Sequence, residues 1–137
     1  MDQTHIVYIM VAEVTHGIRV SVITKYMDGH SKPDLHYFLF TYKIKIENNS
    51  EFAVQLLRRH WHIFDSTNGL REVEGEGVIG QQPVIAPGEF FEYESACDLT
   101  TDMGSMRGIY LMQRRIDNEQ FEIKIPRFEL IAPRRLN

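Results

Sequence analysis

The 137-residue sequence has little of what disulfide scaffolds, nucleic-acid binders and membrane proteins need. Its single cysteine, Cys97, excludes an intramolecular disulfide and favours a reducing compartment, so we expect a cytoplasmic protein. The formal net charge of −4 supplies no basic surplus to neutralise phosphates, and we expect no general nucleic-acid binding. The apolar run from Ile6 to Ala12 is too short to span a bilayer, and no basic residue precedes it. We interpret this run as a buried first strand and expect no membrane contact.

The sequence also lacks apolar residues at helical spacing. Apolar and polar residues instead alternate with a period of two in residues 18–22, 37–46 and 121–125, as in strands with one buried and one solvated face. Turn-forming pairs separate these segments: His16-Gly17, Asp28-Gly29, Asn68-Gly69, Pro87-Gly88 and Asp117-Asn118. Many short strands without helices predict an all-β, antiparallel sandwich or barrel. The length predicts a single domain over residues 1–137.

One pair of strands can be aligned from the sequence. If the turn over residues 48–50 joins two neighbouring strands, Phe38 lies opposite Trp61. Directly opposed residues share a face of a sheet. This register therefore collects on the core side Phe38, Tyr42, Ile46, Leu57 and Trp61. It places on the outer side His60 and His62, near Tyr37 and Leu39.

The segment "GEGVIG", residues 75–80, has the spacing of a dinucleotide-binding glycine loop. Such a loop must open a helix, whose free amides bind pyrophosphate. Here Pro83, Pro87 and Gly88 follow and exclude a helix, so the dinucleotide fold is excluded. Two interpretations remain. The glycines shape the backbone of a strand end or loop, or their amides form an anion-binding nest without a helix.

The segment "GEGVIGQQPVIAPGEFFEYESACDLTTDMGSMRGIYLM" resembles the signature of the ApaG family. The upstream "ENNSEFAVQLLRRHWHIFDSTNG" resembles the same family, and together the likeness covers about residues 11–133. Three positions depart from the usual pattern: Ala96 replaces a glycine, Asp98 a proline, and His62 an aliphatic residue. The resemblance implies a β-sandwich of the fibronectin type III or immunoglobulin-like kind.

The resemblance implies little about activity. Bacterial members take their name from a gene next to the diadenosine tetraphosphate hydrolase, and the family has been linked to cobalt and magnesium tolerance. In eukaryotes the domain occurs within F-box proteins and a polymerase-delta-interacting protein. These contexts imply an interaction module and name no reaction.

Catalytic and metal-binding residues are hard to find in the sequence. Cys97 has no histidine within ten residues, and a lone cysteine is more often a packed residue than a nucleophile. His60 and His62 point the same way on a strand, but zinc needs at least three protein ligands, and the register puts His36 on the core side. Glu92 and Glu94 are most simply a solvated strand face. We therefore predict no catalytic residue, no metal site and no cofactor.

Phosphate binding is the best small-ligand hypothesis. Arg107 follows Gly104 and Ser105 in what the sequence suggests is a turn, and an arginine beside exposed amides suits phosphate. Arg58 or Arg59 could contribute from a neighbouring strand. The candidate phosphate ligands are Gly75, Gly77, Gly80, Gly104 and Arg107.

Protein interaction is the alternative for the outer face, which in this register carries Tyr37, Leu39, Leu56 and His62. A protein partner, a second sheet or the second copy of a homodimer would cover such a patch. We predict a non-enzymatic binding module with a protein partner. The alternatives are a binder of phosphate-bearing small molecules, such as pyrophosphate or a nucleotide, and last a nucleotide hydrolase.

Overall fold

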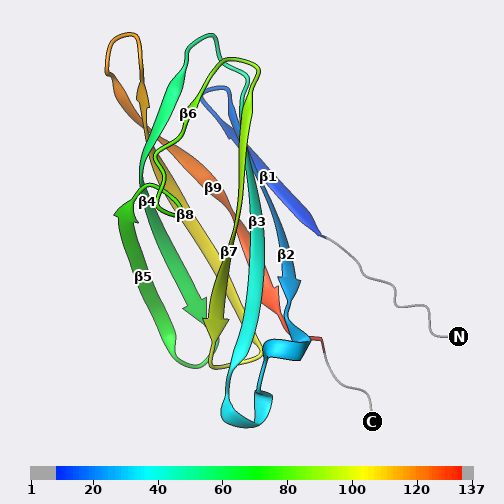
Figure 1. Ribbon diagram of the computed structural model, residues 1–137. Helices are drawn as coiled ribbons and strands as arrows, with labels where there is room; N and C mark the ends of the chain where they lie inside the picture. The colour runs from blue at the N-terminus through cyan, green and yellow to red at the C-terminus, as the bar shows by residue number, and fades with distance from the viewer. Residues whose placement is uncertain (1–8, 134–137) are drawn as a thin grey trace, which may run out of the picture.

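The computed structural model describes residues 9–133, which form two antiparallel β-sheets packed face to face (Figure 1). Long strands alternate with short turns, and two 3₁₀ turns, η1 and η2, lie between the second and third strands. The elements are β1 (Met10–Thr15), β2 (Ile18–Tyr26), η1 (Asp28–His30), η2 (Pro33–Leu35), β3 (Phe38–Asn48), β4 (Val54–Asp65), β5 (Gly69–Glu76), β6 (Val84–Ile85), β7 (Phe90–Leu99), β8 (Met103–Arg114) and β9 (Gln120–Ile131).

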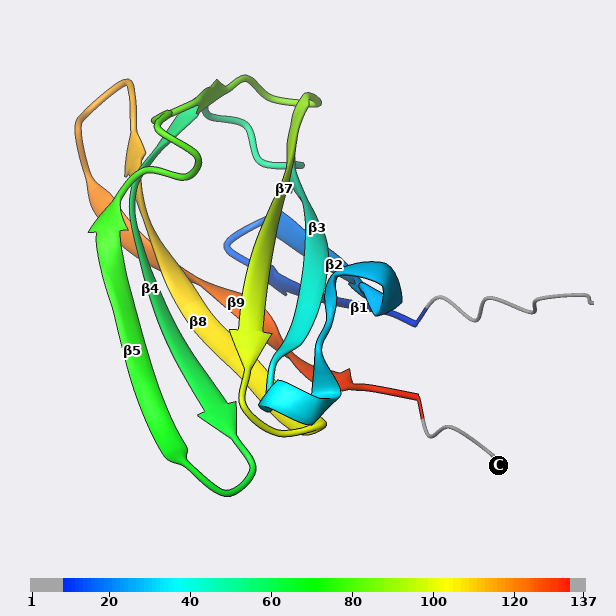
Figure 2. The same cartoon turned by 60° about the horizontal axis from the view of Figure 1, so that its bottom comes forward.

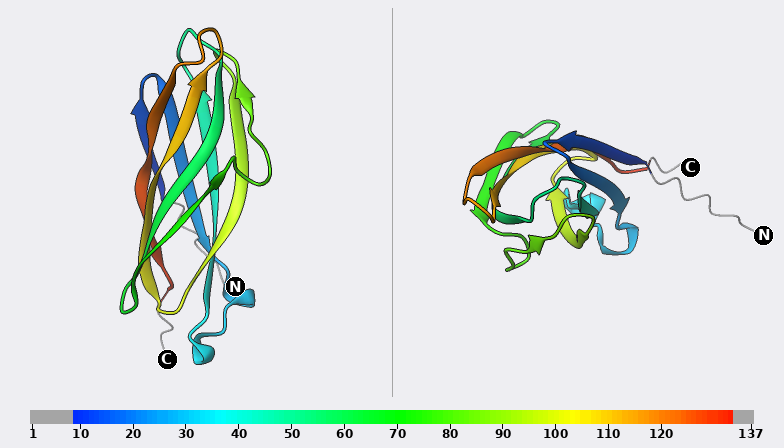
Figure 3. Two further views of the ribbon diagram at one scale, coloured as in Figure 1. Left: turned by 90° about the vertical axis from the view of Figure 1, so that its left-hand side faces the viewer. Right: turned by 90° about the horizontal axis from the view of Figure 1, so that it is seen from above.

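The first sheet has the strand order β1-β2-β3-β7, and the second has the order β5-β4-β8-β9, with β6 paired to β4. Figure 2 shows β2, β3 and β7 facing β5, β4 and β8. The sheets approach each other where the Lys124 amide of β9 donates to the Thr15 hydroxyl of β1 at 3.2 Å. The strands run along the long axis, so most turns gather at the two ends of the molecule (Figure 3). This arrangement confirms the predicted all-β, antiparallel β-sandwich.

The core lies between the sheets and is filled by the inward-facing residues of each period-two segment. Trp61 of β4 is 2% exposed, and its ring contacts Tyr42 of β3 and Phe128 of β9 at centroid distances of 5.5 and 5.8 Å. Aromatic rings at such distances and edge-on angles add to the gain from burial itself. The alternation in the sequence thus identified the buried side of β2, β3 and β9.

The predicted hairpin between residues 38–48 and 53–62 is wrong. β3 pairs with β2 and β7, whereas β4 pairs with β5, β6 and β8, so the two strands belong to opposite sheets. The buried Asn48 explains the crossing. Its side-chain amide donates to the carbonyls of Phe52 and Ile85 at 2.7 and 2.9 Å, and its oxygen accepts from the Ser50 amide and hydroxyl. Such local side-chain bonds compete with a tight hairpin turn and hold the chain on its path between sheets.

The predicted core residues of that hairpin nevertheless point inward, because strands on opposite sheets share the same core. Tyr42, Ile46 and Trp61 are buried, and Phe38 packs against them. Leu57 is only partly buried, because a β-bulge between Leu56 and Arg58 shifts the register there.

The first strand also differs from its prediction. β1 begins at Met10 and lies at the edge of its sheet, with Met10 and Val14 exposed, so it is not a buried strand. Ile6, Val7 and Tyr8 lie outside the described residues. Within residues 9–133 there is no helix long and apolar enough to cross a membrane.

Candidate functional site

The glycine motif forms a tight turn beyond β5. Val78 and Gln81 face each other as an isolated antiparallel bridge, and the two residues between them, Ile79 and Gly80, have φ of 45° and 74°. Positive φ at both central residues is the pattern of a type I′ turn. Gly77 precedes it with φ of 62°, and a Cβ there would lie 2.1 Å from the carbonyl oxygen of Gln81. The turn therefore needs the glycine at position 77 for space as well as for conformation.

Polar groups of this turn are engaged by the protein itself. The amides of Gly77, Val78 and Gln81 donate to backbone carbonyls. Nη1 of Arg59, on β4, donates to the carbonyls of Glu76 and Gly77 at 2.9 Å each. A Cβ on Gly75 would lie 2.9 Å from the same Nη1, so that glycine makes room for the guanidinium. The loop thus turns carbonyl oxygens towards a cation, the reverse of an anion-binding nest.

Gly104 and Arg107 lie on β8 and not in the predicted turn. A Cβ on Gly104 would meet the Phe64 carbonyl at 2.2 Å, so this glycine permits close strand packing. Arg107 sits at a bulge opposite His62, whereas the Gly77 amide bonds to Leu57, five residues earlier on β4. That offset is on the order of 15 Å along the strand. The structure therefore does not bring Arg107 to the glycine loop, and phosphate binding stays a prediction.

The predicted apolar outer patch is not assembled. Leu56 is fully buried in the core, because the bulge after it leaves it facing inward. Leu39 lies on β3 of the first sheet, and Tyr37 lies just before that strand. His62 lies on β4 of the second sheet.

His60 and His62 do lie on the outer face of β4, but their neighbours are not Tyr37 and Leu39. They face two glutamates of β5, where His60 is registered with Glu74 and His62 with Glu72. His36 is exposed at the end of η2 with φ of 56° and is not a core residue. The Asn68-Gly69 turn signal was present in the sequence, and folding the chain back at this turn would have revealed the glutamates.

Cys97 has the properties of a packed residue. It is 5% exposed, and burial raises the pKa of its thiol to about 11, against the opposing effect of Arg71. Nη2 of Arg71 lies 3.4 Å from the sulfur and 2.6 Å from the Asp98 carbonyl. A thiol with this pKa is almost entirely protonated at neutral pH, so it is a poor nucleophile.

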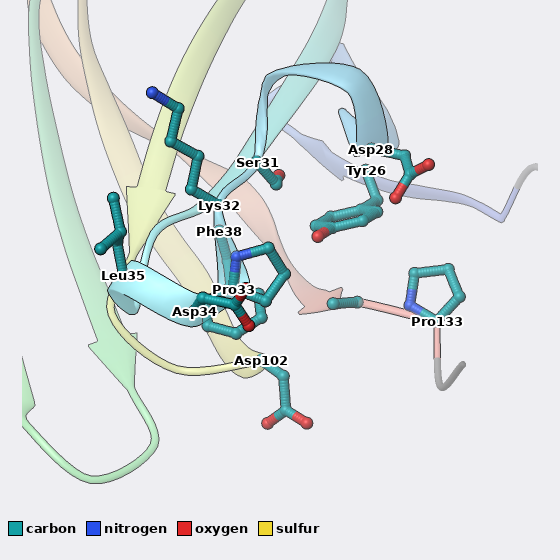
Figure 4. A pocket seen from close by; sticks show the side chains of 11 residues that line it. Tyr26, Asp28, Ser31, Lys32, Pro33, Asp34, Leu35, Phe38, Asp102 and Pro133 are labelled. Atoms are coloured by element: carbon teal, nitrogen blue, oxygen red, sulfur yellow. The ribbon is translucent and has the colours of Figure 1, made fainter. Parts of the chain in front are cut away.

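A cleft opens at the end of the sandwich that carries η1 and η2 (Figure 4). It has a volume of about 1110 Å³ and is formed by three separate parts of the chain. Figure 4 shows the Tyr26 ring pointing into the space between Pro33 and Pro133, with the Asp102 carboxylate on the neighbouring turn. The lining residues are Tyr26, Asp28, Ser31, Lys32, Pro33, Asp34, Leu35, Phe38, Asp102, Ala132 and Pro133.

The cleft combines aromatic and apolar surface with an excess of negative charge. Three aspartates and one lysine line it. Leu35 at its rim is 71% exposed. Sequence reasoning missed this cleft because residues 26–38, 102 and 132–133 carry no motif and meet only in the folded chain.

Comparison with known proteins gives a consistent result. A family model described as the ApaG domain matches residues 28–114. Proteins named ApaG from a Methylobacterium species and from Brucella canis are 45% and 44% identical, over 87% and 90% of this chain and 91% and 95% of their own lengths. A crystal structure described as the putative ApaA protein from Bordetella pertussis superposes with a TM-score of 0.80 at 38% identity, covering 93% of this chain and 97% of that one.

Proposed function

This chain belongs to the ApaG family, and from that premise we propose that it is a non-enzymatic binding module which docks a basic segment of a protein partner in the cleft beside η2. The observation that carries this proposal is the cleft itself, in which the aromatic and proline side chains of Tyr26, Phe38 and Pro33 lie beside the carboxylates of Asp34 and Asp102. Binding sites are typically concave and mostly apolar, with a few polar groups that set specificity.

The charge and the apolar surface of the cleft indicate which kind of peptide segment would bind there. Lysine and arginine side chains bring a charge complementary to the aspartates, and their cations interact favourably with the faces of aromatic rings. An apolar residue beside the basic one would pack on Leu35 and Pro33, which are available at the rim. A basic segment with an apolar anchor therefore fits both features of the cleft.

The buried, protonated thiol of Cys97 supports the non-enzymatic part of this proposal. Cys97 is buried and its pKa is raised, so it is protonated where a nucleophile must be ionised. The sandwich architecture is shared with fibronectin type III and immunoglobulin-like domains, in which loops at the ends often bind partners. A specific likeness to fibronectin type III remains a prediction.

The test is a selection of random peptides on the purified protein, followed by affinity measurements on the selected peptides. We expect selected peptides to combine Lys or Arg with an apolar residue. Removing both rim charges, in Asp34→Asn with Asp102→Asn, should weaken binding by roughly 2- to 30-fold, since exposed charge pairs contribute about 0.2–1 kcal/mol each. Leu35→Ser should weaken it separately.

The matched control is Glu89→Gln, which removes one exposed negative charge at the residue before β7. Figure 1 shows β7 starting at the end of the sandwich opposite the segment between β2 and β3. Binding that is insensitive to the two aspartate changes, or that responds as strongly to Glu89→Gln, would exclude the cleft. Peptides selected without basic residues would exclude the proposed charge recognition.

Phosphate binding at residues 75–80 is the second candidate, and the geometry of the turn gives it less support because the amides of Gly77, Val78 and Gln81 already donate to backbone carbonyls. A melting-temperature titration with pyrophosphate tests it, since a ligand at 100 times its Kd adds about 2.7 kcal/mol of stability. Because Arg107 lies away from the loop, Arg107→Ala should leave any such shift unchanged.

A further inference from the structure

We propose that His60, His62 and Glu72 form a binding site for a divalent first-row transition-metal ion on the outer face of the β4–β5 hairpin. This site is separate from the cleft beside η2, and neither proposal depends on the other. Within residues 9–133, one ligand atom from each of these three residues can be chosen so that all lie within 4.8 Å of one another.

The sheet brings these side chains together. Residues 60 and 62 are two apart on one strand, so both rings point to the outer face. The antiparallel register then places Glu72 directly opposite His62 and diagonal to His60. The rings of the two histidines are stacked, with centroids 4.6 Å apart and planes inclined by 28°.

The distances between ligand atoms suit a metal ion. The Nε2 atom of His60 is 3.2 Å from one Glu72 oxygen, and the Nδ1 atom of His62 is 3.4 Å from the other. Two donors on a tetrahedral ion with bonds of about 2.0–2.1 Å stand about 3.3 Å apart. Each histidine thus already stands at this spacing from one Glu72 oxygen, and side-chain rotation must close the remaining spread of up to 4.8 Å before one ion can be bound by all three residues.

Glu74 supplies an outer partner for one ligand. Its carboxylate lies 3.2 Å from Nδ1 of His60, on the side of the ring away from Glu72. With the proton on Nδ1 and donated to Glu74, the lone pair of Nε2 faces the site. A carboxylate behind a ligating histidine fixes the ring and increases its basicity, and this arrangement recurs in protein metal sites.

The donor set indicates the class of ion. Two imidazole nitrogens and one carboxylate suit Zn²⁺, Co²⁺, Ni²⁺ and Cu²⁺, whereas Mg²⁺ and Ca²⁺ prefer oxygen ligands alone. The histidine side chains are 27% and 25% exposed and Glu72 is 59% exposed, so water or a group from another molecule can complete the coordination. The exposed Arg107 is registered with His62 on the side away from β5 and supplies no ligand.

Calorimetric titration of the untagged, full-length protein with Zn²⁺ tests this proposal, with Mg²⁺ as the comparison ion. We expect one Zn²⁺ per chain and no comparable binding of Mg²⁺. His60→Gln, His62→Gln and Glu72→Gln should each weaken Zn²⁺ binding at least tenfold. Glu74→Gln should weaken it by roughly 10- to 100-fold, as for other outer-shell partners.

Matched controls are His30→Gln and Glu92→Gln, which remove an exposed histidine and an exposed glutamate elsewhere. Both should bind Zn²⁺ as the unaltered protein does. A second readout needs no variant: in the unaltered protein, Zn²⁺ should shift the imidazole NMR signals of His60 and His62 and leave those of His30 in place. The proposal is overturned if binding does not saturate below about 1 mM Zn²⁺, if the three ligand variants bind as the controls do, or if the two imidazole signals do not respond.

Discussion

The phenol oxygens of Tyr93, on β7, and Tyr110, on β8, lie 2.5 Å apart across the interface between the two sheets. Both residues are buried, and Tyr110 is 0% exposed. Burial raises the pKa of each phenol, so both are neutral and one donates to the other. This bond is a polar link between the two sheets inside a mostly apolar core.

Removing the hydroxyl of one tyrosine of this pair should lower the free energy of unfolding more than removing both hydroxyls. Tyr110→Phe leaves the Tyr93 hydroxyl buried without its partner, at a cost of about 1–3 kcal/mol in the free energy of unfolding. The double variant Tyr93→Phe with Tyr110→Phe should recover much of this loss, because two apolar rings of the same shape need no partner. Urea denaturation of the unaltered protein, the two single variants and the double variant measures the coupling energy between the two hydroxyls. Strictly additive effects would contradict the shared hydrogen bond.

Asp65, at the end of β4, should stabilise the fold at neutral pH and lose this effect in acid. Burial raises the pKa of its carboxyl, but hydrogen bonds from the hydroxyls and amides of Thr101 and Thr100 outweigh burial and lower it. Because the pKa of this carboxyl is lower in the folded protein than in the unfolded chain, its ionised form stabilises the fold. This stabilisation is fully present above the unfolded-state pKa of about 3.9 and is lost as the pH falls through the folded-state pKa.

Asp65→Asn should therefore lower the free energy of unfolding by about 1–3 kcal/mol at pH 7, because the amide cannot accept all four bonds. The difference from the unaltered protein should shrink below about pH 4. Denaturation across a pH series measures both effects, with the exposed Asp98→Asn as control. An equal difference at pH 7 and pH 3 would show that the ionised carboxylate is not responsible.

Trp61→Ala should cost about 3–5 kcal/mol, because it leaves a large cavity between the sheets. The matched control on the same strand is Phe64→Ala, whose ring faces outward and is 41% exposed. Its cost should stay near 1–2 kcal/mol, roughly in proportion to the part of the ring that is covered. Trp61 is the only tryptophan in the sequence, so the Trp61→Ala variant has no tryptophan fluorescence to follow. Circular dichroism can follow unfolding in both variants. Similar costs at the two positions would be inconsistent with the core placement of the indole.

Gly77, just before the tight turn, and Gly80, within it, should respond differently to alanine. Both have positive φ, but a Cβ at Gly77 meets the Gln81 carbonyl, whereas one at Gly80 meets nothing within 4 Å. Gly80→Ala should therefore cost only the conformational penalty of about 1–2 kcal/mol. Gly77→Ala should cost clearly more, since the backbone must also move. Thermal and urea denaturation compare the pair, and equal costs would refute the close approach at position 77.

The sequence by itself determined the class of the fold and the family. Alternation over residues 18–22, 37–46 and 121–125 identified strands and their buried faces, because a strand repeats every two residues whatever sheet it joins. The proline and glycine positions after residue 80 excluded a dinucleotide site in the same local way. The spacing of His60 and His62 also showed that they share a face.

Only the tertiary structure decided which strands are neighbours. A turn after Asn48 can return the chain to the same sheet or carry it across the core, and both paths bury nearly the same side chains, with Leu56 in place of Leu57. Strand pairing also brings Arg59 against the glycine loop and Asp102 to the cleft, whereas Glu72 reaches the histidines through the local β4–β5 hairpin. Local periodicity predicts which face of a strand a side chain occupies. A binding site also depends on which residues of neighbouring strands lie beside that side chain, and strand pairing over long sequence separations determines these neighbours.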